Sequence, residues 1–132
     1  MSTLAPVSVA LEVTEAVLEL STAEVAQELS AALTRPIVAS IMGVSATKVV
    51  AQWEREGAIT PQRDRALRLA LQLTRIIMTR FAAPVARTWM VGRNSRLEDA
   101  TPASVIRAAA VGVEDDAMER RVLNAARSFV TR

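Results

Sequence analysis

The sequence contains neither cysteine nor histidine, and only 3% of its residues are aromatic. Without thiols or imidazoles the chain has no disulfide framework, no thiolate nucleophile, no cysteine/histidine zinc site and no imidazole acid–base group. Four glycines and five prolines leave few breaks, which favours helices over a sandwich of short strands. With so few aromatic residues, the core must be built from alanine, valine, leucine, isoleucine and methionine.

Long apolar stretches are also missing. No uninterrupted apolar run reaches the roughly 20 residues that a membrane span requires, and no charged-then-apolar signal peptide opens the chain. We therefore expect a cytoplasmic protein that does not interact with a membrane. At 132 residues, of which 51% are hydrophobic and 23% charged, the chain suits one globular domain or two small modules sharing a core.

Charge is unevenly distributed, although the net charge is only +2. Residues 1–33 carry five Glu and no Lys or Arg, and residues 34–97 carry eleven Lys or Arg against three acids. Residues 98–132 carry five Arg against six acids. A basic middle between acidic flanks places any nucleic-acid contact in that middle. The alternative is a solvated, arginine-rich surface without a ligand.

Apolar spacing and capping residues predict an all-α helical bundle. Ser21 and Glu24 form a capping-box pattern that starts a helix to about residue 33. After a loose leader at 1–8, residues 8–20 are expected to be helical, although 7–13 also alternate as a strand would. The remaining helices are expected at 35–42 with Thr34 as cap, 46–56 with Ser45 as cap, 61–81, 84–90, 102–110 and 113–132. The 61–81 segment is apolar around most of its circumference, so it should be the central buried helix.

A candidate DNA-reading element lies in the basic middle, in "SIMGVSATKVVAQWEREG" at 40–57. Counted from Ala39, Gly43 lies four residues on and Val49 ten residues on, which is the Ala…Gly…Val spacing of a helix-turn-helix. Its second helix would pack Trp53 into the bundle. It would expose side chains suited to phosphates and base edges, namely Ser45, Thr47, Lys48, Gln52 and Arg55. The alternative is an ordinary amphipathic helix with a solvated outer face.

Three arginines near the start of the expected 61–81 helix also have two interpretations. Arg63, Arg65 and Arg68 could hold phosphate at a helix start, or they could lie on a solvated helix face. The residues alone do not distinguish the two.

The order of features beyond Trp53 is more distinctive: "QWEREGAITPQRDRALRLALQLTRII", then "ARTWM", then "NSRLEDATPASVIRAA". This order resembles the Xre/MbcA/ParS family of antitoxins over residues 21–110. Members join an Xre-like helix-turn-helix to a toxin-binding module with a Trp-containing helix, an Asn…Leu loop and a Pro-led helix. The corresponding residues here are Trp89, Asn94, Leu97, Pro102, Val105 and Ile106. The loop "VGRNSRLEDATP" departs from the glycine-rich pattern of many relatives, and Trp53 lies one residue later than usual relative to Gly43.

The resemblance implies a leader or helix at 1–20, an Xre-like helix-turn-helix domain with a long central helix at 21–81 and a small helical toxin-binding module at 82–132. It implies a type II antitoxin that neutralises a RES-domain toxin acting on NAD and represses its own promoter by binding operator DNA. Such a protein would be no enzyme and hold no metal or cofactor. It would form a homodimer or part of a larger toxin–antitoxin assembly. We expect toxin contacts at Asn94, Arg96, Glu114, Asp115, Asp116, Arg127 and Phe129.

Other interpretations stay open. The chain could be a stand-alone dimeric helix-turn-helix regulator whose C-terminal half serves only dimerisation. It could be an enzyme that uses carboxylates such as Glu98 and Asp99, although no metal-ligand spacing or phosphate-binding glycine loop supports this. The terminal 113–132 segment is amphipathic, and it could enter a cleft of the toxin or simply complete the bundle.

Overall fold

The computed structural model describes residues 6–131, with side chains from Val13 onward, as an all-α bundle. Its elements are α1 (Pro6–Glu19), α2 (Thr22–Leu33), α3 (Arg35–Met42), α4 (Thr47–Glu56), α5 (Pro61–Met78), α6 (Ala83–Val91), the short 3-10 turn η1 (Ser95–Leu97), α7 (Pro102–Ala110) and α8 (Asp116–Val130). No strand occurs between residues 6 and 131. The predicted fold class, an all-α helical bundle, is confirmed.

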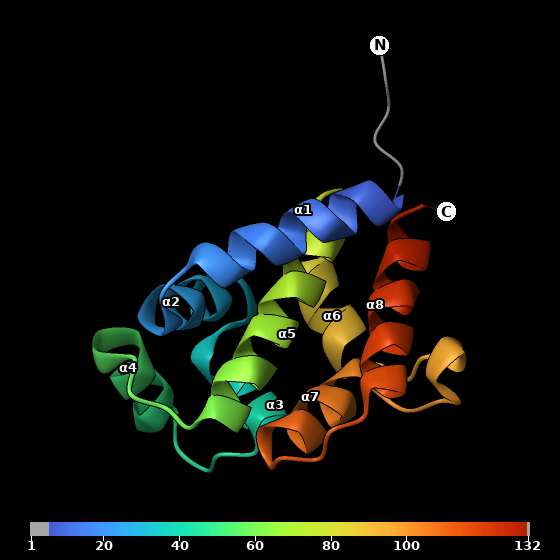
Figure 1. Cartoon of the computed structure of the whole chain (residues 1–132). Helices are drawn as coiled ribbons and strands as arrows, with labels where there is room; N and C mark the ends of the chain where they lie inside the picture. Colours follow the sequence, from blue (N-terminus) through green and yellow to red (C-terminus); the bar gives the residue numbers. More distant parts are fainter. Residues whose placement is uncertain (1–5, 132) are drawn as a thin grey trace.

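The helix α5 runs through the middle of the bundle and contacts α1, α2, α6, α7 and α8 (Figure 1). Leu67, Leu71 and Leu73 on it are fully buried, so the prediction of a central buried helix is confirmed. The helix ends at Met78, earlier than expected, where the Thr79 hydroxyl donates a hydrogen bond to the Ile76 carbonyl at 2.6 Å. Met78, the last residue of the helix, is 42% exposed.

One hydrophobic core connects the two halves of the chain. Its buried side chains extend from Val17 in α1 to Ala126 in α8. The helices α7 and α8 pack on α5, and α7 also packs on α3. The 82–132 segment, expected to form a toxin-binding module, therefore shares its core with the preceding segment.

Side-chain hydroxyls cap three of the helices, among them the helix for which the sequence predicts a capping box. The Ser21 hydroxyl accepts a hydrogen bond from the Glu24 N–H, and the Glu24 carboxylate accepts one from the Ser21 N–H, which completes the capping box. Bonding to Ser21 lowers the pKa of the Glu24 carboxyl below its ordinary value. The hydroxyls of Thr60 and Thr101 cap α5 and α7 through the N–H groups of Arg63 and Ser104.

Other helix starts differ from the predictions. Thr34 makes no side-chain cap, because its backbone takes φ 78° and ψ 150° at the junction of α2 and α3. The turn after α3 uses all residues from Gly43 to Ala46, so Ala46, not Ser45, precedes α4 and makes no side-chain cap. The last helix begins at Asp116, capped by Asp115, rather than at residue 113.

The first helix begins at Pro6, two residues before the expected start, and residues 1–5 of the expected leader lie outside the described residues. Between residues 6 and 131, no helix has both the length and the apolarity needed to cross a bilayer.

Candidate functional site

The turn between α3 and α4 depends on Gly43. Gly43 adopts φ 72°, a left-handed conformation that strains any residue with a Cβ, and it ends α3. The N–H of the next residue, Val44, donates to the Ala39 carbonyl at 2.9 Å, which closes the turn. Ala39 is buried. The three residues of the sequence spacing thus lie around one tight connection, with Val49 packed against the core.

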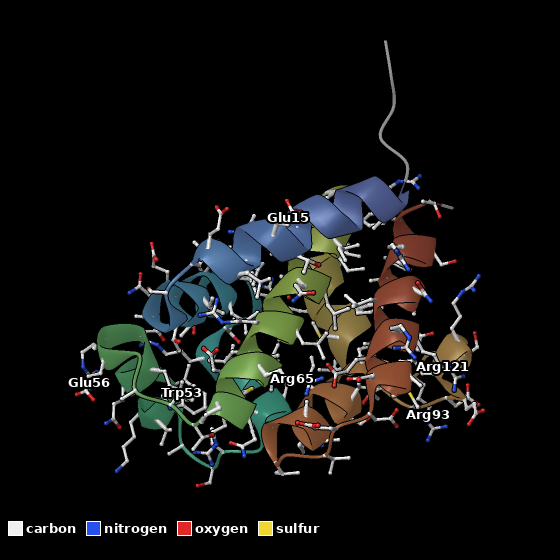
Figure 2. All side chains as sticks on the ribbon, viewed as in Figure 1. Glu15, Trp53, Glu56, Arg65, Arg93 and Arg121 are labelled. Atoms are coloured by element: carbon white, nitrogen blue, oxygen red, sulfur yellow. The ribbon has the colours of Figure 1, made fainter. Side chains whose placement is uncertain are left out.

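The outer side of α4 and its preceding turn is polar and exposed. All five residues predicted to contact DNA are exposed: Ser45, Thr47, Lys48, Gln52 and Arg55. Within this set, Gln52 donates a hydrogen bond to the Glu56 carboxylate at 3.1 Å. The opposite side of the helix buries Val50 and Trp53 against α2 and α3. Figure 2 shows Trp53 directed inward and Glu56 outward at the end of α4.

Polar contacts fix the position of α4 on its neighbours. The Arg35 guanidinium, at the start of α3, donates two hydrogen bonds to the Glu54 carboxylate, at 2.7 and 2.9 Å. These bonds lower the pKa of Glu54 and raise the pKa of Arg35. The Gln27 amide of α2 donates to the Glu54 backbone carbonyl at 2.7 Å. The Arg63 guanidinium lies over the Trp53 ring, 6.0 Å from its centroid.

Arg107 of α7 also supports this region, and the sequence pattern did not single it out. Its guanidinium donates to the Ser40 carbonyl at 3.1 and 2.9 Å, near the C-terminus of α3. A cation there is favourable because backbone carbonyls concentrate negative charge at that end of a helix. The aliphatic part of Arg107 lies 3.4 Å from where a Cβ on Gly43 would stand. A residue of the C-terminal half therefore supports the α3–α4 turn.

The arginines at the start of α5 are engaged within the protein. Arg68 binds the Asp64 carboxylate and the carbonyls of Val17 and Leu20, which ties α1 to α5. Arg65 faces three carboxylates, those of Glu114, Asp116 and Glu119, and Glu119 contributes most to raising the Arg65 pKa. Arg65 is exposed, as on a solvated helix face, but it also pairs with carboxylates of the protein itself, whereas Arg68 is engaged with Asp64 and backbone carbonyls.

Several cations have side chains that make no hydrogen bond or ion pair with another residue in the described part of the chain. They are Lys48 and Arg55 on α4, Arg93 and Arg96 in the segment after α6, and Arg120 and Arg127 on α8. An exposed cation without an internal partner is free to bind an external anion. The α4 surface is one of the places where such cations gather.

A second surface is concave. A groove of about 490 Å³ lies between α6 and α8, and we call it the α6–α8 groove. Trp89 and Phe129 form part of its apolar wall, with ring centroids 6.4 Å apart, and Phe129 also packs against Phe81 at 5.1 Å. A smaller adjoining hollow of about 170 Å³ extends it to Arg96. The groove is lined by Pro84, Val85, Thr88, Trp89, Gly92, Arg93, Asn94 and Phe129.

Six of the seven residues expected to contact a toxin fall into two places. Asn94 and Phe129 line the α6–α8 groove, and Arg96 borders it. The Asn94 side chain also accepts a hydrogen bond from the Arg96 N–H, which shapes η1. The acidic residues lie at the other end of α8, where Glu114 and Asp116 pair with Arg65 and Asp115 caps the helix. Arg127 is half-buried on α8 and is not among the residues that line the groove.

Within the described residues, no group of three or more Asp or Glu side chains is arranged to hold a metal ion. Compared with family models, with curated proteins and with solved structures, the chain matches none.

Proposed function

We propose that the protein binds operator DNA through a helix-turn-helix formed by α3 and α4. The observation that carries the proposal is the outer surface of α4, where the side chains of Lys48 and Arg55 make no hydrogen bond or salt bridge among the described residues and stand beside Ser45, Thr47 and Gln52. A convex helix with polar side chains fits the major groove, where base edges present hydrogen-bonding groups. The ion pair between Arg35 and Glu54 supports this function, because a recognition helix must be held rigidly.

We further propose that the chain is the antitoxin of a type II system and that its partner is a RES-domain toxin. The resemblance over residues 21–110 supports this part. Asn94, Arg96, Arg127 and Phe129 are at least partly exposed and can contact a partner protein. The acidic run is less suited to direct contact, because Glu114 and Asp116 already face Arg65 and Asp115 caps α8.

The second candidate function is a stand-alone dimeric transcriptional regulator. It is favoured by the same α4 surface, and it requires no toxin. The neighbouring gene distinguishes the two functions, since an antitoxin is expected beside a gene for a RES-domain protein. Co-expression adds a direct test. An antitoxin restores growth to cells that produce the toxin, whereas a stand-alone regulator leaves them arrested.

DNA binding is tested by titrating the full chain onto a duplex from the region upstream of its own coding sequence. We expect Lys48→Ala/Arg55→Ala to weaken binding by on the order of 10–100-fold. The slope of log affinity against log salt concentration should also become less steep, by an amount that corresponds to roughly two lost phosphate contacts. The matched control is Arg120→Ala/Arg127→Ala, which removes the same charge from α8. Equal weakening by both double variants would indicate unspecific electrostatics and reject α4 as the contact surface.

A further inference from the structure

The α6–α8 groove joins an apolar compartment to a cationic one. Val85, Trp89 and Phe129 form apolar walls in the groove of about 490 Å³. The adjoining hollow of about 170 Å³ shares Trp89 and Phe129 with the groove and adds Arg96 and Ala125. Because the same two rings line both spaces, the two spaces are continuous. A ligand that fills both needs an apolar body and a polar head.

The polar side chains of the hollow can all donate hydrogen bonds. Arg93 lines both spaces and Arg96 lines the hollow, and neither guanidinium makes a hydrogen bond or ion pair within the described residues. The Asn94 side-chain oxygen accepts a hydrogen bond from the Arg96 N–H at 3.0 Å, which leaves the amide NH₂ group to donate. The Ser95 hydroxyl is exposed beside them. None of the residues that line the two spaces is acidic, so the favoured head is an anion.

Arg121 of α8 holds the cationic end of the groove in place. Its guanidinium donates a hydrogen bond to the Arg96 carbonyl at 3.1 Å, which fixes η1 against α8. The same guanidinium lies 3.9 Å from the Glu98 carboxylate, the acid closest in sequence to the hollow. Figure 2 shows Arg93 and Arg121 on the same side of the bundle. Glu98 therefore pairs with Arg121 and leaves Arg93 and Arg96 available to a ligand.

A second apolar hollow offers no such cation. It has a volume of about 450 Å³, and residues of α2, α5 and α6 line it, among them Met78. Arg75, the guanidinium in its wall, already donates to both oxygens of the Glu28 carboxylate, at 2.6 and 2.5 Å. Of these two apolar spaces, only the α6–α8 groove can neutralise the charge of an anionic ligand.

We propose that the α6–α8 groove binds a small amphipathic carboxylate. Its aromatic or branched aliphatic body lies between Val85, Trp89 and Phe129, and its carboxylate lies at Arg93 and Arg96. The planar fork of a guanidinium matches the two oxygens of a carboxylate, while burial of the body adds affinity that does not depend on charge. The inference is independent of the proposed function, because the binding requires neither DNA nor a toxin.

Such a ligand has one consequence for the proposed function, and this consequence alone rests on that function. Asn94 and Phe129, which line both spaces, are also expected to contact a toxin. A carboxylate bound in the groove therefore competes with the toxin for the same surface.

Three compounds separate the two parts of the site. Phenylbutyrate carries a ring and a carboxylate, phenylbutyramide keeps the ring without the charge, and acetate keeps the charge without the ring. Each is titrated onto the full chain by calorimetry and onto Trp53→Phe, in which Trp89 fluorescence alone reports on the groove. We expect phenylbutyrate to bind with a dissociation constant on the order of 0.1 mM. Phenylbutyramide and acetate should each bind at least about tenfold more weakly.

Variants locate the binding. Arg93→Gln/Arg96→Gln should raise the dissociation constant of phenylbutyrate about tenfold and leave that of phenylbutyramide unchanged. Thr88→Phe, an exposed position that lines the groove, should weaken both compounds because the larger side chain occupies the apolar compartment. Circular dichroism confirms that each variant is folded.

Two matched controls should leave binding unchanged. Lys48→Gln/Arg55→Gln removes the same charge from α4, and Met78→Gln alters the second hollow. The proposal is overturned if phenylbutyrate does not bind saturably, if phenylbutyramide binds as tightly, or if Arg93→Gln/Arg96→Gln binds phenylbutyrate like the wild type. Weakening by Met78→Gln would place the compound in the second hollow, and equal weakening by Lys48→Gln/Arg55→Gln would indicate net charge alone. Either result also overturns it.

Discussion

The only two tryptophans, Trp53 in α4 and Trp89 in α6, lie beneath surfaces of opposite shape. Trp53 is 3% exposed, and the helix that carries it presents a convex polar side to solvent. Trp89 is 9% exposed and forms part of the wall of the α6–α8 groove. Tryptophan thus packs beneath a convex helix surface in one region and in the wall of a groove in the other.

The difference follows from what surrounds each tryptophan. Arg63 covers the Trp53 ring, and Arg35 holds the neighbouring Glu54, so the Trp53 side of α4 is closed. Beside Trp89, the rings of Phe129 and Phe81 are tilted and leave space between α6 and α8. In both regions, unpartnered cations stand at the outer edge. A convex cationic surface suits the groove of a nucleic acid, whereas a cationic hollow beside an apolar groove suits a small amphipathic carboxylate.

The largest expected effect comes from removing either tryptophan. Trp53→Ala and Trp89→Ala should each lower the free energy of unfolding by about 3–5 kcal/mol, because each leaves a cavity in the shared core. Urea unfolding followed by circular dichroism measures the change, and Trp53→Phe and Trp89→Phe are the controls. Each of these controls retains one tryptophan, so its fluorescence reports on that ring alone. Native emission resembling that of free indole in either control would show that the remaining tryptophan is solvated, and would contradict this prediction.

A smaller effect concerns the ion pair that holds α4. Arg35 lowers the pKa of Glu54, so the pair stabilises the fold above the ordinary glutamate value of about 4.3. This contribution is lost as the pH falls through the lower, folded-state pKa. We expect Glu54→Gln to cost about 0.5–1 kcal/mol near neutral pH, since Arg35 is half exposed and solvent weakens the pair.

The difference in unfolding free energy between wild type and Glu54→Gln should narrow as the pH falls below about 4. Glu56→Gln, which removes the same charge from the same helix, is the control and should have little effect. A difference between wild type and Glu54→Gln that stays constant from neutral to acidic pH would mean that the carboxylate charge does not stabilise α4.

Local features of the structure could be predicted from the sequence, and long-range ones could not. Ser21, Thr60 and Thr101 cap their helices because each hydroxyl reaches an N–H only three residues away. Ser45 fails as a cap because the length of its turn is set by how α4 packs on α2 and α3. The partners of Arg65 and Arg107 come from distant elements, which spacing along the chain does not reveal.

The candidate site divides in the same way. The exposed residues of α4 could be identified because they share one helix, whose period fixes which side chains point outward. The α6–α8 groove joins α6, the following segment and Phe129 of α8. Trp89 and Phe129 are both apolar in the sequence, but nothing in their order along the chain indicates that a hollow lies between them.

The smallest expected effect concerns backbone strain. Both the α3–α4 region and the region of η1 have a residue other than glycine at positive φ. Thr34, before α3, has φ 78°, and Glu98, after η1, has φ 55°. A β-branched residue at positive φ is strained, whereas a left-handed turn is easier for an unbranched one. Thr34→Gly should therefore raise the free energy of unfolding by about 1 kcal/mol, and Glu98→Gly by less.

The hydrogen bonds from the Thr34 N–H to Ser30 and from the Val38 N–H to Thr34 involve only backbone and are retained in Thr34→Gly. Urea midpoints at unchanged slope measure the gain, and Thr34→Ala, which keeps a Cβ, is the control. A lower midpoint for Thr34→Gly than for Thr34→Ala would show that flexibility in the unfolded chain outweighs the strain at the start of α3.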